Sequence, residues 1–201
     1  MSAPHLVVRD DDPRRPALEA DGYRVTAESW GAQLTADRID HDHLERLIAR
    51  AATLGGEVTE LTSHDAADIC ALDALTVADY PGGPANAHAP LTAETATALC
   101  EPPRRAFGIR IDGAHVAMTA VDPDGDATET DFTAVAPRWR GCGLGTAVKA
   151  TSIVTLAASG IRTFRTGGAA VNDASLGVNR AVGYQVDERW LTYEPSTGPR
   201  A

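Results

Sequence analysis

The stretch from Asp131 to Lys149 reads DFTAVAPRWRGCGLGTAVK and changes character twice along its length. The residues Phe132 to Val135 are typical of the end of a half-buried strand, and Pro137 ends that strand because it has no N–H. From Arg140 to Gly145 three glycines then alternate with other residues, and an apolar helical pattern starts after Leu144. The order of strand, glycine loop and helix predicts an anion cradle, because glycine admits close approach and helix N-termini carry partial positive charge.

The spacing of these glycines excludes two common phosphate-binding loops. A P-loop ends in Gly-Lys-Ser or Gly-Lys-Thr, whereas Gly145 is followed by Thr146 and alanine. A dinucleotide fingerprint needs its third glycine where Thr146 stands, and an acidic residue about 20 positions further on. The chain has no acidic residue there, between Ile161 and Arg165. What remains is the pattern Arg140-x-x-Gly143-x-Gly145 after a strand.

Composition and charge suit a soluble domain with a small appendage. The chain has 201 residues, of which 43% are hydrophobic, enough for a sizeable core. Its net charge of −10 argues against nucleic-acid or anionic-membrane partners and is compatible with a cationic amine substrate. No apolar run approaches the length of a membrane span, and the N-terminus lacks a signal-peptide core. A cytoplasmic protein without a membrane partner is therefore expected.

Cysteines and histidines show no metal-binding pattern. Cys70, Cys100 and Cys142 are far apart and form no Cys-x-x-Cys motif, which indicates a reduced protein without a disulfide framework. His41 and His43 lie in a polar run typical of a solvated helix start. We therefore expect no metal site.

The sequence predicts two parts, residues 1–35 and residues 36–201. In the first part, Gly22-Tyr-Arg-Val25 followed by Glu28-Ser-Trp30 echoes Gly183-Tyr-Gln-Val186 followed by Glu188-Arg-Trp190. The echo indicates a degenerate repeat, the tail of one half before a whole one, with a chance match as the alternative. Strands without a domain of their own are expected to dock on the edge of the main sheet or on a second chain. A homodimer is one of these two outcomes.

The second part alternates between helical and strand patterns. Helices are expected at 43–54, 63–76, 90–100, 144–159 and 172–181, with Ser63 as a cap of the second. Strands are expected at 58–61, 106–111, 115–121, 127–135, 161–166 and 184–193. The strand after the long crossover helix should run parallel to the strand before it. These patterns predict an α/β (α+β) domain with a mixed, mostly antiparallel sheet and flanking helices.

This order of elements resembles the GNAT superfamily of N-acetyltransferases from about His43 to Glu194. Three spaced matches carry the resemblance: Arg140-Gly-Cys-Gly-Leu-Gly145, then Ala147-Val-Lys149, then Arg162-Thr-Phe-Arg-Thr166 followed by Asn172, Asn179 and Gly183-Tyr184. The second and third resemble one bacterial branch, in which tandem halves are common. The resemblance implies a central parallel pair of strands that splay apart, with acetyl-CoA as co-substrate inside the gap.

The resemblance also implies roles for particular residues in binding acetyl-CoA. Val135 would direct its N–H to the thioester oxygen. The pyrophosphate is expected on the loop made of Arg140, Gly141, Cys142, Gly143, Leu144, Gly145 and Thr146, with Arg140 adding charge and Cys142 a filler rather than a nucleophile. Asn172 matches a cofactor-contacting asparagine, with a plain helix N-cap as the alternative.

Proton transfer is where the chain departs from the family pattern. Glu129 matches the base of some members, with a solvated strand carboxylate as the alternative, and Asp131 is expected on the same face. Many members have a tyrosine acid where this chain has Asn179. Either the thiolate leaves unaided, or Tyr80 or Tyr193 supplies the proton.

The expected activity is direct transfer of acetyl from acetyl-CoA to a primary amine of a small molecule. The resemblance places the acceptor between Asp79 and Leu91 and the last hairpin, where the identity of the amine is not encoded. Two alternatives remain: a non-catalytic CoA-binding or regulatory domain, and an enzyme that acetylates a protein or peptide amine.

Overall fold

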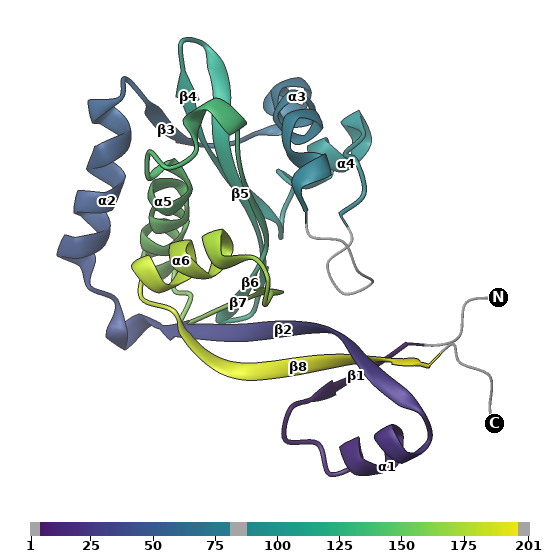
Figure 1. Cartoon of the computed structure of the whole chain (residues 1–201). Helices are drawn as coiled ribbons and strands as arrows, with labels where there is room; N and C mark the ends of the chain where they lie inside the picture. The colour runs from purple at the N-terminus through teal and green to yellow at the C-terminus, as the bar shows by residue number, and fades with distance from the viewer. Residues whose placement is uncertain (1–4, 81–87, 197–201) are drawn as a thin grey trace.

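The computed structural model describes residues 5–80 and 88–196, which form one eight-stranded sheet in the order β1-β8-β2-β7-β6-β5-β4-β3 (Figure 1). The strands are β1 (Leu6–Arg9), β2 (Tyr23–Thr35), β3 (Glu57–Glu60), β4 (Arg105–Ile111), β5 (Ala114–Asp124), β6 (Ala127–Val135), β7 (Thr163–Ala169) and β8 (Gln185–Pro195). Only β6 and β7 pair in parallel among the described strands. The mixed, mostly antiparallel sheet expected from the sequence is confirmed.

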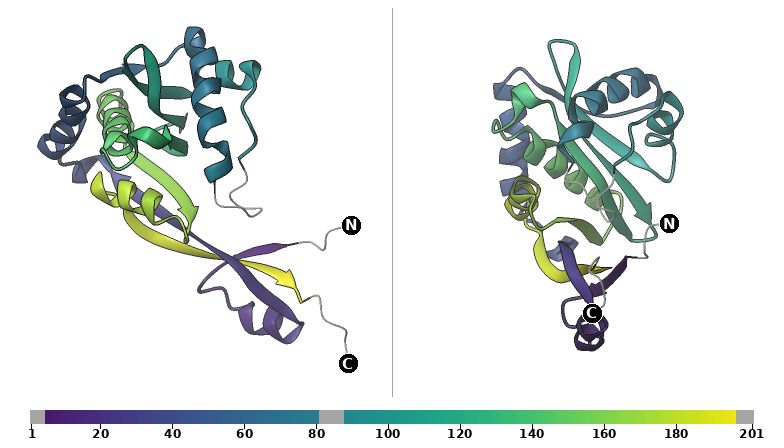
Figure 2. Two further views of the ribbon diagram at one scale, coloured as in Figure 1. Left: turned by 45° about the horizontal axis from the view of Figure 1, so that its top comes forward. Right: turned by 45° about the vertical axis from the view of Figure 1, so that its right-hand side comes forward.

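Helices cover both faces of the sheet. They are α1 (Arg15–Ala20), α2 (His41–Thr53), α3 (Ala66–Thr76), α4 (Ala93–Ala98), α5 (Leu144–Ala158) and α6 (Asp173–Ala181), with 3₁₀ turns η1 (Ala36–Arg38), η2 (Ser63–Asp65), η3 (Val77–Asp79) and η5 (Pro137–Trp139). Figures 1 and 2 show α2, α5 and α6 on one side of the central strands and α3 and α4 on the other. The core between these layers is built mainly from aliphatic side chains, with Phe107 and Phe164 as its most deeply buried rings.

The parallel pair separates after three residues. The register joins Ala127 with Thr163 and ends at Glu129 with Arg165. Beyond this point β6 pairs only with β5, and β7 pairs only with β2 as far as Ala169. The splayed pair is thus confirmed, and a gap opens between the facing edges of β6 and β7.

The N-terminal segment completes the sheet in a place that the sequence did not indicate. Although β1 lies at the edge beside β8, β2 lies inside the sheet, between β7 and β8. The second half of β2 alternates between the two faces and buries Trp30, Ala32 and Leu34 in the main core. Because β2 is paired along both of its edges, it satisfies backbone groups of both β7 and β8. If β2 lay at the edge of the sheet instead, β7 would be paired on one side only.

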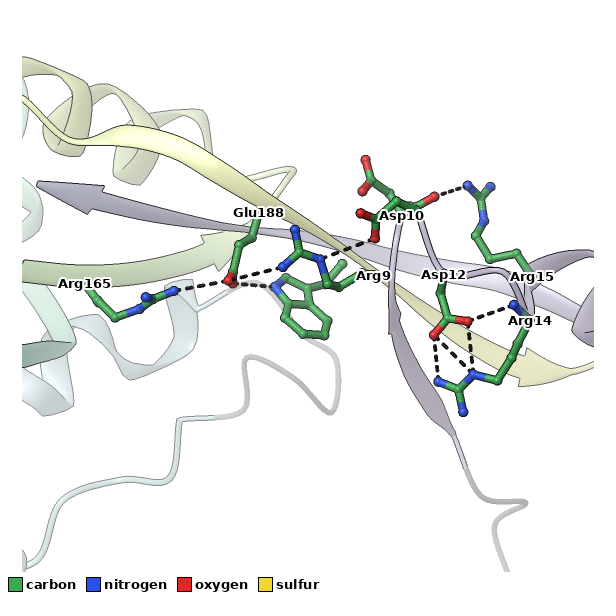
Figure 3. Close-up of polar contacts among 9 residues, drawn as sticks. Arg9, Asp10, Asp12, Arg14, Arg15, Arg165 and Glu188 are labelled. Atoms are coloured by element: carbon green, nitrogen blue, oxygen red, sulfur yellow. Dashed lines mark hydrogen bonds and ion pairs between the residues drawn. The ribbon is translucent and has the colours of Figure 1, made fainter.

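The side chain of Glu188 connects β1, β7 and β8. Its carboxylate accepts from Arg165 Nη2 at 3.2 Å and Trp190 Nε1 at 3.1 Å, and Arg9 Nη1 lies 3.6 Å away. Figure 3 shows Arg165 and Arg9 reaching this carboxylate from opposite sides. The glutamate and tryptophan of the sequence echo are therefore in contact, and they hold the outer strands together.

The start of α3 differs from the expectation. Ser63 lies inside η2 and does not cap a helix; Thr62 precedes this turn and donates its backbone N–H to Asp65 Oδ2 at 2.9 Å. The prediction that Ser63 caps the helix was wrong by one position. Serine and threonine both serve as N-caps, so the residue type does not choose between adjacent positions, and the backbone conformation decides.

Candidate functional site

The gap between β6 and β7 forms the floor of a cleft of about 1010 Å³. The glycine loop and the first turn of α5 close one end, and the wall on the α3 side carries Tyr80 and His88. On β7, a Cβ atom at Gly168 would stand 2.8 Å from the ring of Trp30. The absence of a side chain at Gly168 therefore lets the Trp30 ring pack directly on β7, a contact that follows from the placement of β2 next to β7.

The glycine loop has the geometry of an anion cradle. Gly141 and Gly143 have φ angles of 73° and 85°, a left-handed conformation that favours glycine. Gly143 is the N-cap of α5 and has no side chain to occupy the helix N–H groups. These donors are therefore available to an anion at the end of the cleft.

The first turn of α5 lies directly against the end of β6. A Cβ atom at Gly145 would stand 3.2 Å from Val135 Cγ2, tighter than ordinary van der Waals contact. A glycine at this position lets the helix start close to the strand edge without displacing the Val135 side chain. The cradle and the gap therefore form one continuous surface.

The backbone of Val135 faces the gap. Ala136 donates its N–H to Val116 of the neighbouring β5 at 2.8 Å. Because successive residues of a strand direct their N–H groups to opposite sides, those of Val135 and Thr133 are directed towards the gap. The carbonyl of Val135 accepts from Arg140 Nε at 3.1 Å instead of from β5. Thr133 is a second donor that the sequence pattern did not single out, because the strand's phase depends on its partner.

Two arginines bring positive charge to the cradle. Arg140 Nη2 lies 2.6 Å from Asp79 Oδ2, so this side chain spans the cleft mouth from the end of β6 to η3. Arg50 of α2 lies on the other side, with its guanidinium 3.6–3.7 Å from where a Cβ atom of Gly143 would stand. The sequence predicted a role for Arg140 but missed Arg50, which lies far away along the chain. Cys142 turns away from the cradle, with its sulfur 3.6 Å from the Arg140 carbonyl oxygen.

The two asparagines of α6 line the cleft and make local hydrogen bonds. Asn172 Oδ1 accepts the N–H of Ser175 at 3.0 Å and caps the helix, which is the alternative that the sequence left open. Asn179 is buried and donates Nδ2 to the Ser175 carbonyl at 2.9 Å. Its Oδ1 is buried without a hydrogen-bond partner among the described residues. Within the part of the chain that the structure describes, Asn179 Oδ1 is therefore an unpaired hydrogen-bond acceptor within the α6 side of the cleft.

Glu129 stands where the parallel strands separate. Its side chain is exposed to the cleft, and desolvation by the surrounding walls raises its pKa, opposed by Arg165 and Lys149. A register shift opposite Asp131 interrupts the two-residue alternation on which its expected position depended. Asp131 instead pairs with Arg104. Glu129 is therefore the carboxylate at this end of the gap that retains no ion pair among the described residues.

Lys149 is the single lysine of the chain, and its side chain bridges β6 and β7 from the face of the sheet that α5 covers. Its Nζ donates to Thr130 Oγ1 at 3.1 Å and Thr166 Oγ1 at 3.3 Å, one residue beyond the last parallel pair. Burial lowers its pKa to about 7, although Glu129 acts in the opposite direction. On α5, Thr151 and Thr155 are only partly buried, whereas Lys149 is fully buried.

The two tyrosines named as alternative acids have different surroundings. Tyr193 is fully buried in a small separate core and donates to Glu19 at 2.9 Å, so it does not line the cleft. Tyr80 does line the cleft, and its hydroxyl is buried without a partner among the described residues. Burial raises the pKa of Tyr80, so the phenol stays protonated. Residues 81–87 of the expected acceptor segment lie outside the described residues.

A group of possible metal ligands lies away from the cleft. Oxygen or nitrogen atoms of Asp65, Asp68 and His115 come within 4.8 Å of one another. The guanidinium of Arg110 occupies this group, with Nη2 3.1 Å from Asp65 Oδ1 and 3.4 Å from Asp68 Oδ2. The arrangement is an ion-pair cluster that already contains its cation.

A splayed parallel pair with a glycine cradle at the start of the following helix defines the fold of the GNAT acetyltransferases. The chain belongs to the acetyltransferase (GNAT) family, whose model matches residues 71–184. The matched region includes the glycine loop, the gap between β6 and β7, and Glu129. No curated protein matches the chain in sequence.

Solved structures show the same fold at low identity. A GCN5-related N-acetyltransferase from Kribbella flavida superimposes with a TM-score of 0.64 at 15% identity, covering 98% of this chain and 69% of that one. A tandem GNAT protein from the clavulanic acid biosynthesis pathway gives 0.64 at 20%, covering 98% and 65%. The ribosomal-protein-S18-alanine N-acetyltransferase of Escherichia coli gives 0.55 at 15%, covering 73% and 98%. None of the described helices is long and apolar enough to cross a membrane.

Proposed function

We propose that this protein is an acetyl-CoA-dependent N-acetyltransferase that transfers acetyl directly to a primary amine of a small molecule. The observation that carries the proposal is the pair of N–H groups, of Thr133 and Val135, that face the gap beside the start of α5. Strand amides held in a fixed direction can stabilise the negative charge that develops on a thioester oxygen. The family identity of the chain supports the same chemistry.

Acetyl-CoA would lie in the cleft between the glycine loop and the gap. Its pyrophosphate would lie on the N–H groups from Gly141 to Thr146, where the glycines offer no Cβ atom to obstruct it. Arg140 and Arg50 supply charge on either side, which matters in a protein with a net charge of −10. Asn172, which lines the cleft, would contact the pantetheine arm.

Glu129 is the proposed first proton acceptor. An amine reaches a protein mostly as its ammonium ion and has to lose a proton before it can attack a carbonyl. The carboxylate faces the cleft at the point where the strands separate, and can receive that proton through a water molecule. Its raised pKa moves it towards the neutral range in which general bases work. Val135 then stabilises the oxygen through its N–H.

The amine substrate would enter from the α3 side of the cleft, since the glycine cradle occupies the opposite end. Exposed carboxylates at Asp79 and Asp131 border this entrance and attract a cation, although each is already paired with an arginine. The similarity to an enzyme that modifies the alanine of a ribosomal protein supports a peptide amine as a second candidate. A reducing, cytoplasmic location agrees with three free cysteines.

The test combines the protein, acetyl-CoA, a thiol reagent and a panel of amines comprising aminoglycosides, polyamines, amino acids and peptides. Release of free thiol that depends on a small amine supports the proposal. Release with peptides alone favours the peptide enzyme. Calorimetric binding of acetyl-CoA without thiol release across the panel would indicate instead a non-catalytic CoA-binding domain.

The N-terminal segment suggests the origin of the chain. The superpositions cover 98% of this chain and 65–77% of three longer GNAT structures, one of them tandem. This coverage supports residues 1–35 as the tail of a preceding half, retained because β2 completes the sheet of residues 36–201. A homodimer remains a proposal that light scattering of the full chain tests.

A further inference from the structure

The α3 side of the cleft carries an aspartate–histidine pair to which the steps above assign no role. His88 Nε2 lies 2.6 Å from Asp73 Oδ1, and the second oxygen of Asp73 accepts the N–H of Leu91 at 2.8 Å. Asp73 is 2% exposed, so its carboxylate is fixed at both oxygens inside the protein. The side chain of His88 is 13% exposed and lines the cleft.

Two aromatic rings fix the plane of the imidazole. Tyr80 stacks on His88 with the ring centroids 4.2 Å apart and the planes at 12°. Phe132 meets the imidazole at 5.0 Å in a tilted arrangement. Phe132 immediately precedes Thr133, whose N–H is directed towards the gap. The imidazole therefore lies beside the part of β6 at which acetyl transfer is proposed.

The hydrogen bond to Asp73 decides which nitrogen can accept a proton. Carboxylate oxygens accept, so His88 Nε2 donates and a neutral imidazole carries its lone pair on Nδ1. Within residues 5–80 and 88–196, the only side-chain hydrogen bond of His88 is the one to Asp73. The neighbouring carboxylates Asp79 and Asp131 are neutralised by arginines.

Resting on the proposed acetyl transfer, we infer that His88, oriented by Asp73, is the group that handles the second proton of the reaction. An ammonium ion loses two protons when it becomes an amide. Glu129 takes the first before the attack. His88 Nδ1 takes the second from nitrogen as the N–C bond forms. When the C–S bond breaks, its electron pair moves to sulfur, and the imidazolium supplies the proton of the free thiol.

This assignment also resolves the departure at Asn179. An amide side chain cannot protonate a thiolate, and Tyr80 has its pKa raised by burial, which makes its phenol a poor acid. A neutral imidazole accepts a proton and an imidazolium donates one, so one imidazole can act first as a base and then as an acid. Asp73 touches neither substrate nor cofactor and is a positioning residue.

The test uses two substitutions at one position in the full chain. His88→Gln keeps a donor towards Asp73 but cannot carry the proton, and we expect kcat to fall about 100-fold or more. The dissociation constant for acetyl-CoA, measured by calorimetry, should stay within about twofold, since the cradle is untouched. His88→Ala leaves a cavity, and imidazole added to the assay should restore part of kcat. The control His64→Ala removes an exposed histidine of η2 outside the cleft and should leave kcat unchanged.

Three outcomes separate the hypotheses. Loss of activity in His88→Gln, with imidazole rescue of His88→Ala, supports the assignment, because a merely structural role would not respond to imidazole. An active wild type with an unchanged His88→Gln, or a His88→Ala that imidazole does not rescue, overturns the assignment and leaves acetyl transfer standing. A wild type that releases no thiol with any amine overturns both.

Discussion

Gly145 of α5 and Val135 of β6 approach each other so closely that a Cβ atom at position 145 would stand 3.2 Å from Val135 Cγ2. The contact places the helix N-terminus at the edge of the gap. We expect Gly145→Ala to lower the free energy of unfolding, because overpacking costs about 1–3 kcal/mol and outweighs the helix preference of alanine. Urea unfolding measures this change, and calorimetry should show weaker acetyl-CoA binding.

The matched control is Gly177→Ala, in the middle of α6. A Cβ atom at Gly177 would meet nothing within 4 Å, so this variant should gain up to about 1 kcal/mol of stability from helix propensity. Equal stability changes in the two variants would show that the closeness of α5 to β6 has no energetic consequence.

Arg140 should contribute to acetyl-CoA binding through its charge. Hydrogen bonds to charged groups are worth about 1.5–3 kcal/mol, so Arg140→Ala is expected to weaken binding by about 10- to 100-fold. Arg138→Ala is the control, since this exposed neighbour lies over the Trp139 ring at 5.1 Å and does not line the cleft. Equal affinities in the two variants would contradict the placement of the pyrophosphate.

Lys149 should titrate near neutral pH. Because it is the single lysine, ¹³C-lysine labelling gives one side-chain signal, whose midpoint we expect at about 7 instead of the ordinary 10.5. Between these two values the unfolded chain binds more protons than the native protein, so stability should rise with pH across that window. The destabilisation is fully present below pH 7. Lys149→Met should remove both the signal and the rise, and a midpoint above pH 9 would refute the prediction.

Glu129 should contribute to the acidic limit of activity, together with His88. Desolvation raises its pKa above the ordinary value of 4.5, and only the carboxylate can take a proton. The rate constant kcat/KM should therefore include a fall as pH decreases through this raised pKa, and Glu129→Gln should lose that part of the limb together with most of the rate. Asp124→Asn, at the exposed end of β5, is the control. A wild-type profile that Glu129→Gln leaves unchanged would assign the limb to another group.

The cradle could be predicted because its signals are local. Pro137 ends a strand, and glycines with positive φ lead into a helix, so neighbouring residues alone determine the order of strand, loop and helix. The parallel pairing followed from the connecting helix. The resemblance to a family then gave the loop its expected ligand and Val135 its expected direction towards the gap.

The opposite wall could not be predicted, because it joins segments that are distant in sequence. Asp73 lies in α3 and His88 follows that helix at a distance along the chain. The contact of His88 with Phe132 depends on how α3 packs on the sheet. The register shift at Asp131 also changed which carboxylate stays unpaired near the gap. A bulge depends on both strands of a pair and leaves no mark in the sequence of one.

The position of β2 has a consequence for how the protein is made. This strand leaves the ribosome early, yet both of its neighbours, β7 and β8, lie in the last third of the chain. Until β8 has emerged, β2 lacks one of the two strands between which it pairs, and its apolar side chains Trp30, Ala32 and Leu34 remain more open to chaperones or to misassembly. A chain interrupted between β7 and β8 therefore leaves β2 as an unpaired edge of the sheet.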